Sequence, residues 1–236
     1  MTVHSPMRHD SALKHVTGQA VYIDDMPEPP GTLHAALVLS PVASGRLSKL
    51  DLSAAAASPG VKGAFAAGDI PGRNNIAGSG KEEPLFAEDK VEFAGQPLAV
   101  IVADTLDQAR AAVERAVVEI DPTEAILDVA TALAKHAYVQ APSTILRGDP
   151  DSALKSALHT LSAEFSVGGQ EHFYLEGQVA FVLPGEDGDL IVHSSTQHPT
   201  EVQHVCAQIL GYDFNRVTTV VRRLGGGFGE IGRAHV

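Results

Sequence analysis

Residues 189–229 read DLIVHSSTQHPTEVQHVCAQILGYDFNRVTTVVRRLGGGFG, a stretch that predicts a strand, a helix and a second strand in succession. The strands are expected over residues 189–195 and 215–222. Between them, Pro199 suits the first position of a helix and Gly211 suits its C-terminal stop. The apolar face of this helix comprises Val202, Val205, Cys206, Ile209 and Leu210. The stretch therefore indicates a β-α-β unit, the kind of unit in which ligands bind at strand ends.

Gln197 follows the first of these strands and directly precedes the helix, whose N-cap is expected at His198. Its amide carries both a donor and an acceptor, so it could hydrogen-bond an oxo group of a ligand. The alternative is a loop glutamine that faces water. His198 and His204 lie six residues apart and do not share a helix face, which argues against a shared metal.

The second strand leads into Gly225-Gly226-Gly227-Phe228-Gly229. Glycines let a backbone approach a ligand closely and expose its N–H groups, and the phenylalanine would supply a flat apolar wall. A flexible turn is the alternative interpretation. The pattern fits neither GxGxxG nor a P-loop, which excludes a nucleotide site of those types.

Residues 169–176, which read GQEHFYLE, form a further polar stretch. On composition alone, a surface loop is the favoured interpretation. Glu171-His172 is not a zinc motif, because the second histidine of HExxH is missing. Cys206 lies on the apolar helix face and is interpreted as a packed thiol rather than a nucleophile.

The N-terminal half mixes α and β patterns and has no catalytic signature; Asp24-Asp25 is interpreted as an acidic turn rather than a metal pair. Its expected elements are strands over residues 31–39, 61–67 and 98–103 and a helix over residues 52–58. The run over residues 98–103 is continuously apolar, as in a strand covered on both faces. A second helix follows Thr105, which has capping-box spacing with Gln108, and its apolar face comprises Ala109, Ala112, Val113, Ala116 and Val117.

Asp121-Pro122 ends this first module. Residues 123–142 are interpreted as a connector in which residues 130–135 form one or two helical turns. After it, residues 154–160 are weakly helical, and residues 161–167 alternate apolar and polar side chains, as a half-buried strand does.

Composition excludes several classes of protein. The chain has 236 residues and a net charge of −12, from 17 basic and 29 acidic side chains, so it lacks the clustered cations that nucleic-acid binding needs. No apolar stretch is long enough to span a membrane, and no signal peptide is recognisable at the start, so a cytoplasmic protein is expected. One cysteine supports neither an intramolecular disulfide nor a cysteine-ligated iron–sulfur cluster.

Several strings together resemble the large subunit of the xanthine dehydrogenase and aldehyde oxidase family. In the first module these are VTGQAVYIDD at residues 16–25, DIPG at 69–72 and GQPLAV at 95–100, which resemble an α/β-hammerhead domain. In the second they are GQEHFYLE at 169–176, STQHP at 195–199 and RRLGGGFG at 222–229, which resemble a molybdenum-cofactor domain. The resemblance covers nearly the whole chain, in the family's order.

The resemblance implies an α+β fold with a hammerhead domain over residues 1–122, a linker over 123–142 and the first part of a molybdopterin-binding domain over 143–229. It implies a hydroxylase that oxidises hypoxanthine and xanthine to urate with oxygen from water. By motif position, Gln197 resembles the glutamine that hydrogen-bonds a molybdenum oxo ligand, and it is the catalytic candidate. Cofactor contacts are implied for Gln197, Gly226, Gly227, Phe228 and Gly229, with no residue that ligates the metal directly.

The same resemblance implies partners. Iron–sulfur clusters of the 2Fe-2S type and FAD are expected on a separate small subunit, which predicts a hetero-oligomer. Two alternatives remain open for the activity. One is an aldehyde oxidase or carbon-monoxide-dehydrogenase type of molybdenum subunit, and the other is a non-catalytic hammerhead binding or assembly module.

The C-terminal end departs from the family pattern, which continues GGGFGGKE. Residues 230–236 read EIGRAHV, which resembles the translation of a sequencing adapter and is interpreted as a non-native tail. Glu230 is therefore not equated with the family's purine-binding glutamate. Since that glutamate and the family's catalytic base are both missing, the chain as it stands is expected to be inactive.

Overall fold

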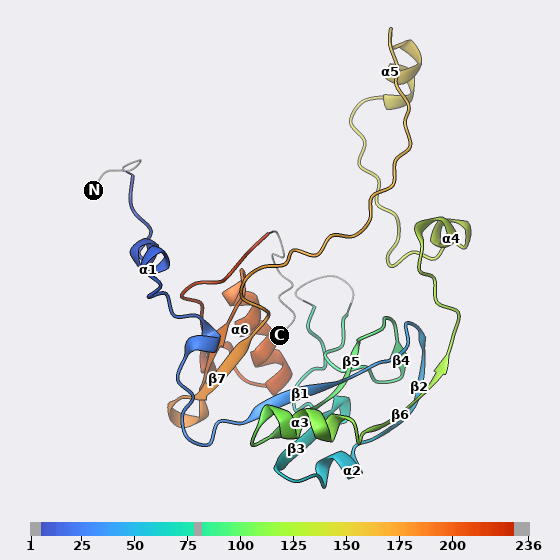
Figure 1. The fold of residues 1–236 in the computed structure, drawn as a ribbon. Coiled ribbons are helices and arrows are strands. Elements are labelled where there is room, and N and C mark those ends of the chain that lie inside the picture. Colours follow the sequence, from blue (N-terminus) through green and yellow to red (C-terminus); the bar gives the residue numbers. More distant parts are fainter. Residues whose placement is uncertain (1–5, 78–81, 229–236) are drawn as a thin grey trace. The chain divides into compact units, whose positions relative to one another are not determined.

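The computed structural model describes residues 6–77 and 82–228 (Figure 1). The chain divides into two compact units. One comprises Met1–Ala125 together with Tyr174–Val236, and the other comprises Ile126–Phe173. Helices and sheets are mixed in the larger unit, as the α+β prediction requires.

The first sheet of the larger unit has the strand order β1-β5-β3 and is antiparallel throughout. Its central strand, β5 (Pro97–Ala103), is flanked by β1 (His34–Leu39) and β3 (Val61–Ala66). Leu98 and Ile101 are fully buried because β5 has a partner on each side and packs into the main hydrophobic core. Helix α3 (Leu106–Val113) contacts all three strands of this sheet.

A second antiparallel sheet has the order β4-β2-β6, formed by β4 (Lys90–Val91), β2 (Gly45–Asp51) and β6 (Val117–Pro122). Strand β2 was not predicted from the sequence, and the predicted helix extended through Val117. In the structure that helix ends at Val113, and Val117 begins a strand that pairs with Asp51. The helical period continues by chance across the turn, so spacing alone could not locate the end of the helix.

The third sheet carries the β-α-β unit predicted from the sequence. Strands β8 (Leu190–Ser194) and β9 (Val217–Val220) are parallel and are joined by α6 (Pro199–Leu210), while β7 (Ala180–Pro184) pairs with β8 in antiparallel fashion. A small core forms between helix and sheet from Val192, Val202, Ala207 and Val217.

The helix boundaries predicted at three capping residues are confirmed. The His198 side chain accepts a hydrogen bond from the Glu201 amide at 3.0 Å, and Gly211 ends α6 with a φ of 67°. Thr105 caps α3 by accepting from the Gln108 amide at 3.2 Å. Each cap satisfies backbone groups that a helix end leaves unpaired.

The turn that contains Gly72 connects the N-terminal half of the larger unit to the end of α6. The Gly72 amide donates to the Ile209 carbonyl at 2.8 Å, and the Gln208 side chain donates to the Asn75 carbonyl at 2.6 Å. A Cβ atom at position 72 would overlap the Gln208 carbonyl oxygen. Glycine is therefore required here by close packing against the helix end.

The smaller unit contains α4 (Val129–Ala134) and α5 (Pro150–Ser156). The strand predicted over residues 161–167 is wrong, because the described residues of this segment form no strand. Leu161 and Phe165 are 96% and 86% exposed, so among the described residues nothing pairs with this segment or buries its apolar side. The boundaries proposed at residues 122 and 142 stay predictions.

The remaining helical segments are α1 (Ala12–Thr17), α2 (Ser53–Ala56) and the 3₁₀ turns η1 (Ile23–Asp25), η2 (Ala67–Asp69), η3 (Glu186–Gly188) and η4 (Phe214–Arg216). Within the described part of the chain, none of the helices has the length and apolar character needed to cross a bilayer.

Candidate functional site

The segment between β8 and α6 holds its backbone in place with its own side chains. The Ser195 hydroxyl accepts from the Val179 amide at 2.9 Å and lies 3.1 Å from the Gly177 carbonyl. Thr196 is 3% exposed, and its hydroxyl accepts from the His198 amide at 3.0 Å. Gln197 therefore starts from a backbone that is fixed on both sides.

The side-chain amide of Gln197 is oriented against the glycine-rich loop. A Cβ atom at Gly227 would lie 2.8 Å from Gln197 Nε2 and 3.0 Å from Cδ, so the two are in close contact. Gln197 Oε1 is buried and has no hydrogen-bond partner among the described residues. A buried amide oxygen without a partner costs free energy unless a donor is supplied, so it is a candidate for contact with a ligand.

Two further glycines of the loop, Gly225 and Gly226, are required by close approach rather than by a left-handed backbone. A Cβ atom at Gly225 would overlap Glu176, and one at Gly226 would overlap Tyr174. Of these two glycines, Gly226 was predicted to contact the cofactor. In the structure the chain segment that precedes β7 already occupies part of the space that they leave.

Glu176 anchors the loop, a role that the sequence pattern did not predict. Its side chain is 9% exposed, and one carboxylate oxygen accepts from the Gly225 amide at 3.0 Å while the other accepts from the Ile23 amide at 3.2 Å. The Leu175 amide donates to the Gly225 carbonyl at 3.2 Å. Glu176 thus links three segments distant in the sequence. In the sequence, Glu176 is one of several polar side chains in residues 169–176, and nothing there distinguishes it from the others.

A small hollow brings several of these groups together, and its lining includes Tyr174, Glu176, Gln178, Ser195, Gln197 and Gly226. Of the residues predicted to contact a cofactor, Gln197 and Gly226 line this hollow and Gly227 packs against Gln197. Phe228 is 62% exposed. Gly229 and residues 230–236 lie outside the described residues.

The donor set of this site suits an organic cofactor. Its polar groups are amides, hydroxyls and backbone N–H groups, and its one carboxylate is already engaged by two amides. Among residues 6–77 and 82–228, no three histidine, cysteine or acidic side chains are grouped so as to hold a metal ion. The unpaired Gln197 Oε1 and the close-packed glycines fit a cofactor that is held by hydrogen bonds.

Cys206 takes no part in this site. It packs against the core between α6 and the third sheet, as the helical spacing predicts, and burial raises the pKa of its thiol. A raised pKa keeps the thiol protonated at neutral pH and makes it a poor nucleophile.

Comparison with known proteins identifies both halves of the chain. The family model described as "Aldehyde oxidase and xanthine dehydrogenase, a/b hammerhead domain" matches residues 17–124. The model described as "Molybdopterin cofactor-binding domain" matches residues 133–234. The chain belongs to the xanthine dehydrogenase and aldehyde oxidase family. The hollow that contains Gln197 lies in the half of the chain that matches the cofactor-binding model.

Relatives in this family include both of its named branches. Xanthine dehydrogenase from Dictyostelium discoideum is 38% identical over 227 residues, and aldehyde oxidase 4 from Rattus norvegicus is 36% identical over 229 residues; each alignment covers 96% of this chain. The chain spans 17% of the length of these relatives. The solved structure of the aldehyde oxidoreductase from Desulfovibrio gigas superposes with a TM-score of 0.80 at 29% identity, over 93% of this chain and 26% of that one.

Proposed function

We propose that this chain is part of the molybdenum-bearing subunit of a hydroxylase that oxidises hypoxanthine and xanthine to urate. Each such oxidation adds one oxygen atom from water and releases two electrons and two protons. Gln197 carries the proposal, because its buried and unpaired Oε1 lies at the end of β8 in a domain of the cofactor-binding type. The purine substrate is supported by relatives named xanthine dehydrogenase at 38% to 41% identity.

The molybdenum cofactor would be held by Gln197 and by the backbone N–H groups of Gly226, Gly227 and Phe228, with Gly229 as a further proposed contact. The Gly225 amide is excluded from this set because it already donates to Glu176. When bound, the cofactor supplies the two-electron redox chemistry of the hydroxylation. Gln197 would orient it through the side-chain amide, whose position is fixed by the Ser195 and Thr196 hydrogen bonds on the adjoining backbone.

Electrons from the reaction need a path out of this subunit. The chain contains a single cysteine, which is too few to ligate an iron–sulfur cluster. We therefore propose that 2Fe-2S clusters and FAD are carried on a partner subunit in a cytoplasmic hetero-oligomer. Co-purification of an iron–sulfur flavoprotein with the complete protein would test this arrangement.

An aldehyde-oxidising enzyme is the second candidate. It is favoured by the relatives named aldehyde oxidase and by the structural match to the D. gigas aldehyde oxidoreductase. Both candidates would use the same cofactor and the same Gln197 contact, so substrate preference is the property that separates them.

The decisive experiment is to purify the complete protein, measure its molybdenum content and assay it with an artificial electron acceptor. Hypoxanthine, xanthine and an aromatic aldehyde would be compared at equal concentration. Faster turnover of the purines supports the proposal, whereas turnover of the aldehyde alone supports the second candidate. Stoichiometric molybdenum without oxidation of any of the three substrates would contradict both.

A further inference from the structure

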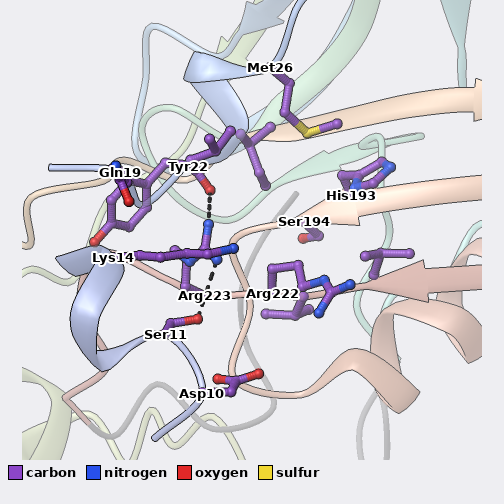
Figure 2. Close-up of a pocket in the computed structure, with 14 residues that line it drawn as sticks. Asp10, Ser11, Lys14, Gln19, Tyr22, Met26, His193, Ser194, Arg222 and Arg223 are labelled. Carbon is purple, nitrogen blue, oxygen red and sulfur yellow. Dashed lines mark hydrogen bonds between the residues drawn. The ribbon is translucent and has the colours of Figure 1, made fainter. Parts of the chain in front are cut away.

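A hollow of about 350 Å³ is formed by the N-terminal segment and the ends of β8 and β9 (Figure 2). The N-terminal segment contributes α1 and the turn at Tyr22, and the strand ends contribute Ser194 and residues 220–223. This hollow shares no lining residue with the smaller one around Gln197. Its volume is at the lower end of the range of pockets that bind small molecules.

The charges around this hollow are unbalanced. Lys14, Arg222 and Arg223 line it, and in the described part of the chain none of the three forms an ion pair. The one acidic group of the lining, Asp10, is 3.3 Å from His9. Three cations and one carboxylate leave a net charge of about +2 in a chain whose net charge is −12. Such a local excess of positive charge attracts anions.

The guanidinium of Arg223 is held in place without being neutralised. Its Nη1 donates to the Val21 carbonyl at 2.6 Å, and its Nη2 donates to the Ser11 hydroxyl at 3.3 Å (Figure 2). Its Nε is buried and has no acceptor among the described residues. A partly buried cation without a counter-charge has a free-energy cost, and a bound anion would lower that cost. The Arg223 site therefore favours the binding of an anion.

Ser194 supplies a second polar group that is available to a ligand. The residue is 1% exposed, and its hydroxyl has no hydrogen-bond partner within the described ranges. It lies in the same lining as Arg222 and Arg223 (Figure 2). A buried hydroxyl without a partner is rare in folded proteins, and here it offers a neutral donor next to the cations.

We propose that this hollow binds a small organic phosphate monoester. A phosphate monoester carries a charge of about −1.5 to −2 at neutral pH, which matches the local excess of positive charge, whereas a monocarboxylate would neutralise only half of it. Tyr22, Met26 and Val220 supply an apolar wall for the organic part of the ligand. The proposal does not depend on which substrate the enzyme oxidises.

The phosphate could come from a separate metabolite or from the molybdenum cofactor, because a pterin cofactor of this class itself bears a phosphate monoester. The two sources predict different behaviour. A separate ligand binds equally well to cofactor-free and cofactor-loaded protein. The cofactor's own phosphate would fill the hollow only in the loaded protein and would block added ligand there.

The test is isothermal titration of the complete protein with phenyl phosphate and with benzoate at constant ionic strength, first in cofactor-free form and then in cofactor-loaded form to separate the two sources. Phenyl phosphate should bind saturably and about tenfold more tightly than benzoate, because it forms more charge-assisted hydrogen bonds. Lys14→Gln and Arg222→Gln should each weaken phenyl phosphate binding about tenfold. Both side chains are exposed, so these variants are expected to fold.

Arg110→Gln is the matched control, because Arg110 is an exposed cation on α3 and its loss changes the net charge by the same amount. The affinity of the Arg110→Gln variant for phenyl phosphate should equal that of the unmodified protein. The proposal is overturned if cofactor-free protein shows no saturable binding of phenyl phosphate. It is also overturned if the control loses as much affinity as the two pocket variants, since the attraction would then be nonspecific.

Discussion

Glu176→Gln is the substitution that most directly tests how the glycine-rich loop is held. The carboxylate of Glu176 accepts one backbone amide on each oxygen, from Ile23 and from Gly225. A glutamine has the same shape but only one acceptor oxygen, so its NH₂ group would face one of the two amides. That amide becomes a buried unsatisfied donor, and the remaining hydrogen bond loses its charge assistance.

Leaving one buried donor unpaired costs about 1–3 kcal/mol, and a hydrogen bond to a charged group contributes about 1.5–3 kcal/mol. We therefore expect Glu176→Gln to lower the free energy of local opening by about 2–3 kcal/mol. This corresponds to roughly 30- to 150-fold faster hydrogen exchange in peptides that contain Ile23 and Gly225.

Hydrogen–deuterium exchange followed by mass spectrometry measures this change directly. Glu186→Gln is the matched control. Glu186 is exposed and lies in η3, so its substitution removes the same charge outside the loop. The control should exchange like the unmodified protein in both peptides. Unchanged protection at Ile23 and Gly225 in Glu176→Gln would refute the role assigned to the carboxylate.

Gln197→Ala should slow turnover by about ten- to a hundredfold, because a polarised hydrogen bond contributes roughly 1.5–3 kcal/mol; normal turnover at full molybdenum loading would exclude Gln197 from the site. Gly227→Ala should lower the molybdenum content, since the added methyl group would lie 2.8 Å from Gln197 Nε2, and metal analysis at normal occupancy would argue against this packing. Gly72→Ala should lower the free energy of unfolding by about 1–3 kcal/mol, measured by urea unfolding. Gly68 has open space around it, so the control Gly68→Ala should have little effect. Equal stabilities of the two variants would show that the turn is not packed against α6. Limited proteolysis should cut first within residues 123–142, and uniform cleavage along the chain would count against the proposed linker.

The β-α-β unit of the second half could be predicted from the sequence because its signals are local. Pro199 and Gly211 mark the ends of a helix whose apolar face follows a regular period, and the strands on either side are short apolar runs. Backbone preferences of single residues determine such boundaries before any tertiary contact forms. Gln197 was found in the same way, as the polar residue between a predicted strand and a predicted helix.

Pairing between distant segments could not be predicted from the sequence. Strand β6 exists because it pairs with β2, some 70 residues earlier, and the helical spacing that runs up to Val117 gave no sign of it. Conversely, residues 161–167 alternate like a strand, but no strand in the described part of the chain pairs with them, and they form none. A strand is stabilised by its neighbours, so its sequence pattern is a necessary but not a sufficient condition.

The sequence by itself thus determined the β-α-β unit, its caps and the position of Gln197 at a strand end. Only the tertiary structure decided what the glycines and Glu176 do. The glycines at 225 and 226 are required because Glu176 and Tyr174 approach them closely, and Gly227 packs against the end of the Gln197 side chain. Glu176 is buried because the amides of Ile23 and Gly225 converge on it. A buried carboxylate is tolerated only where donors from the folded chain satisfy it, and those donors lie 153 and 49 residues away along the sequence.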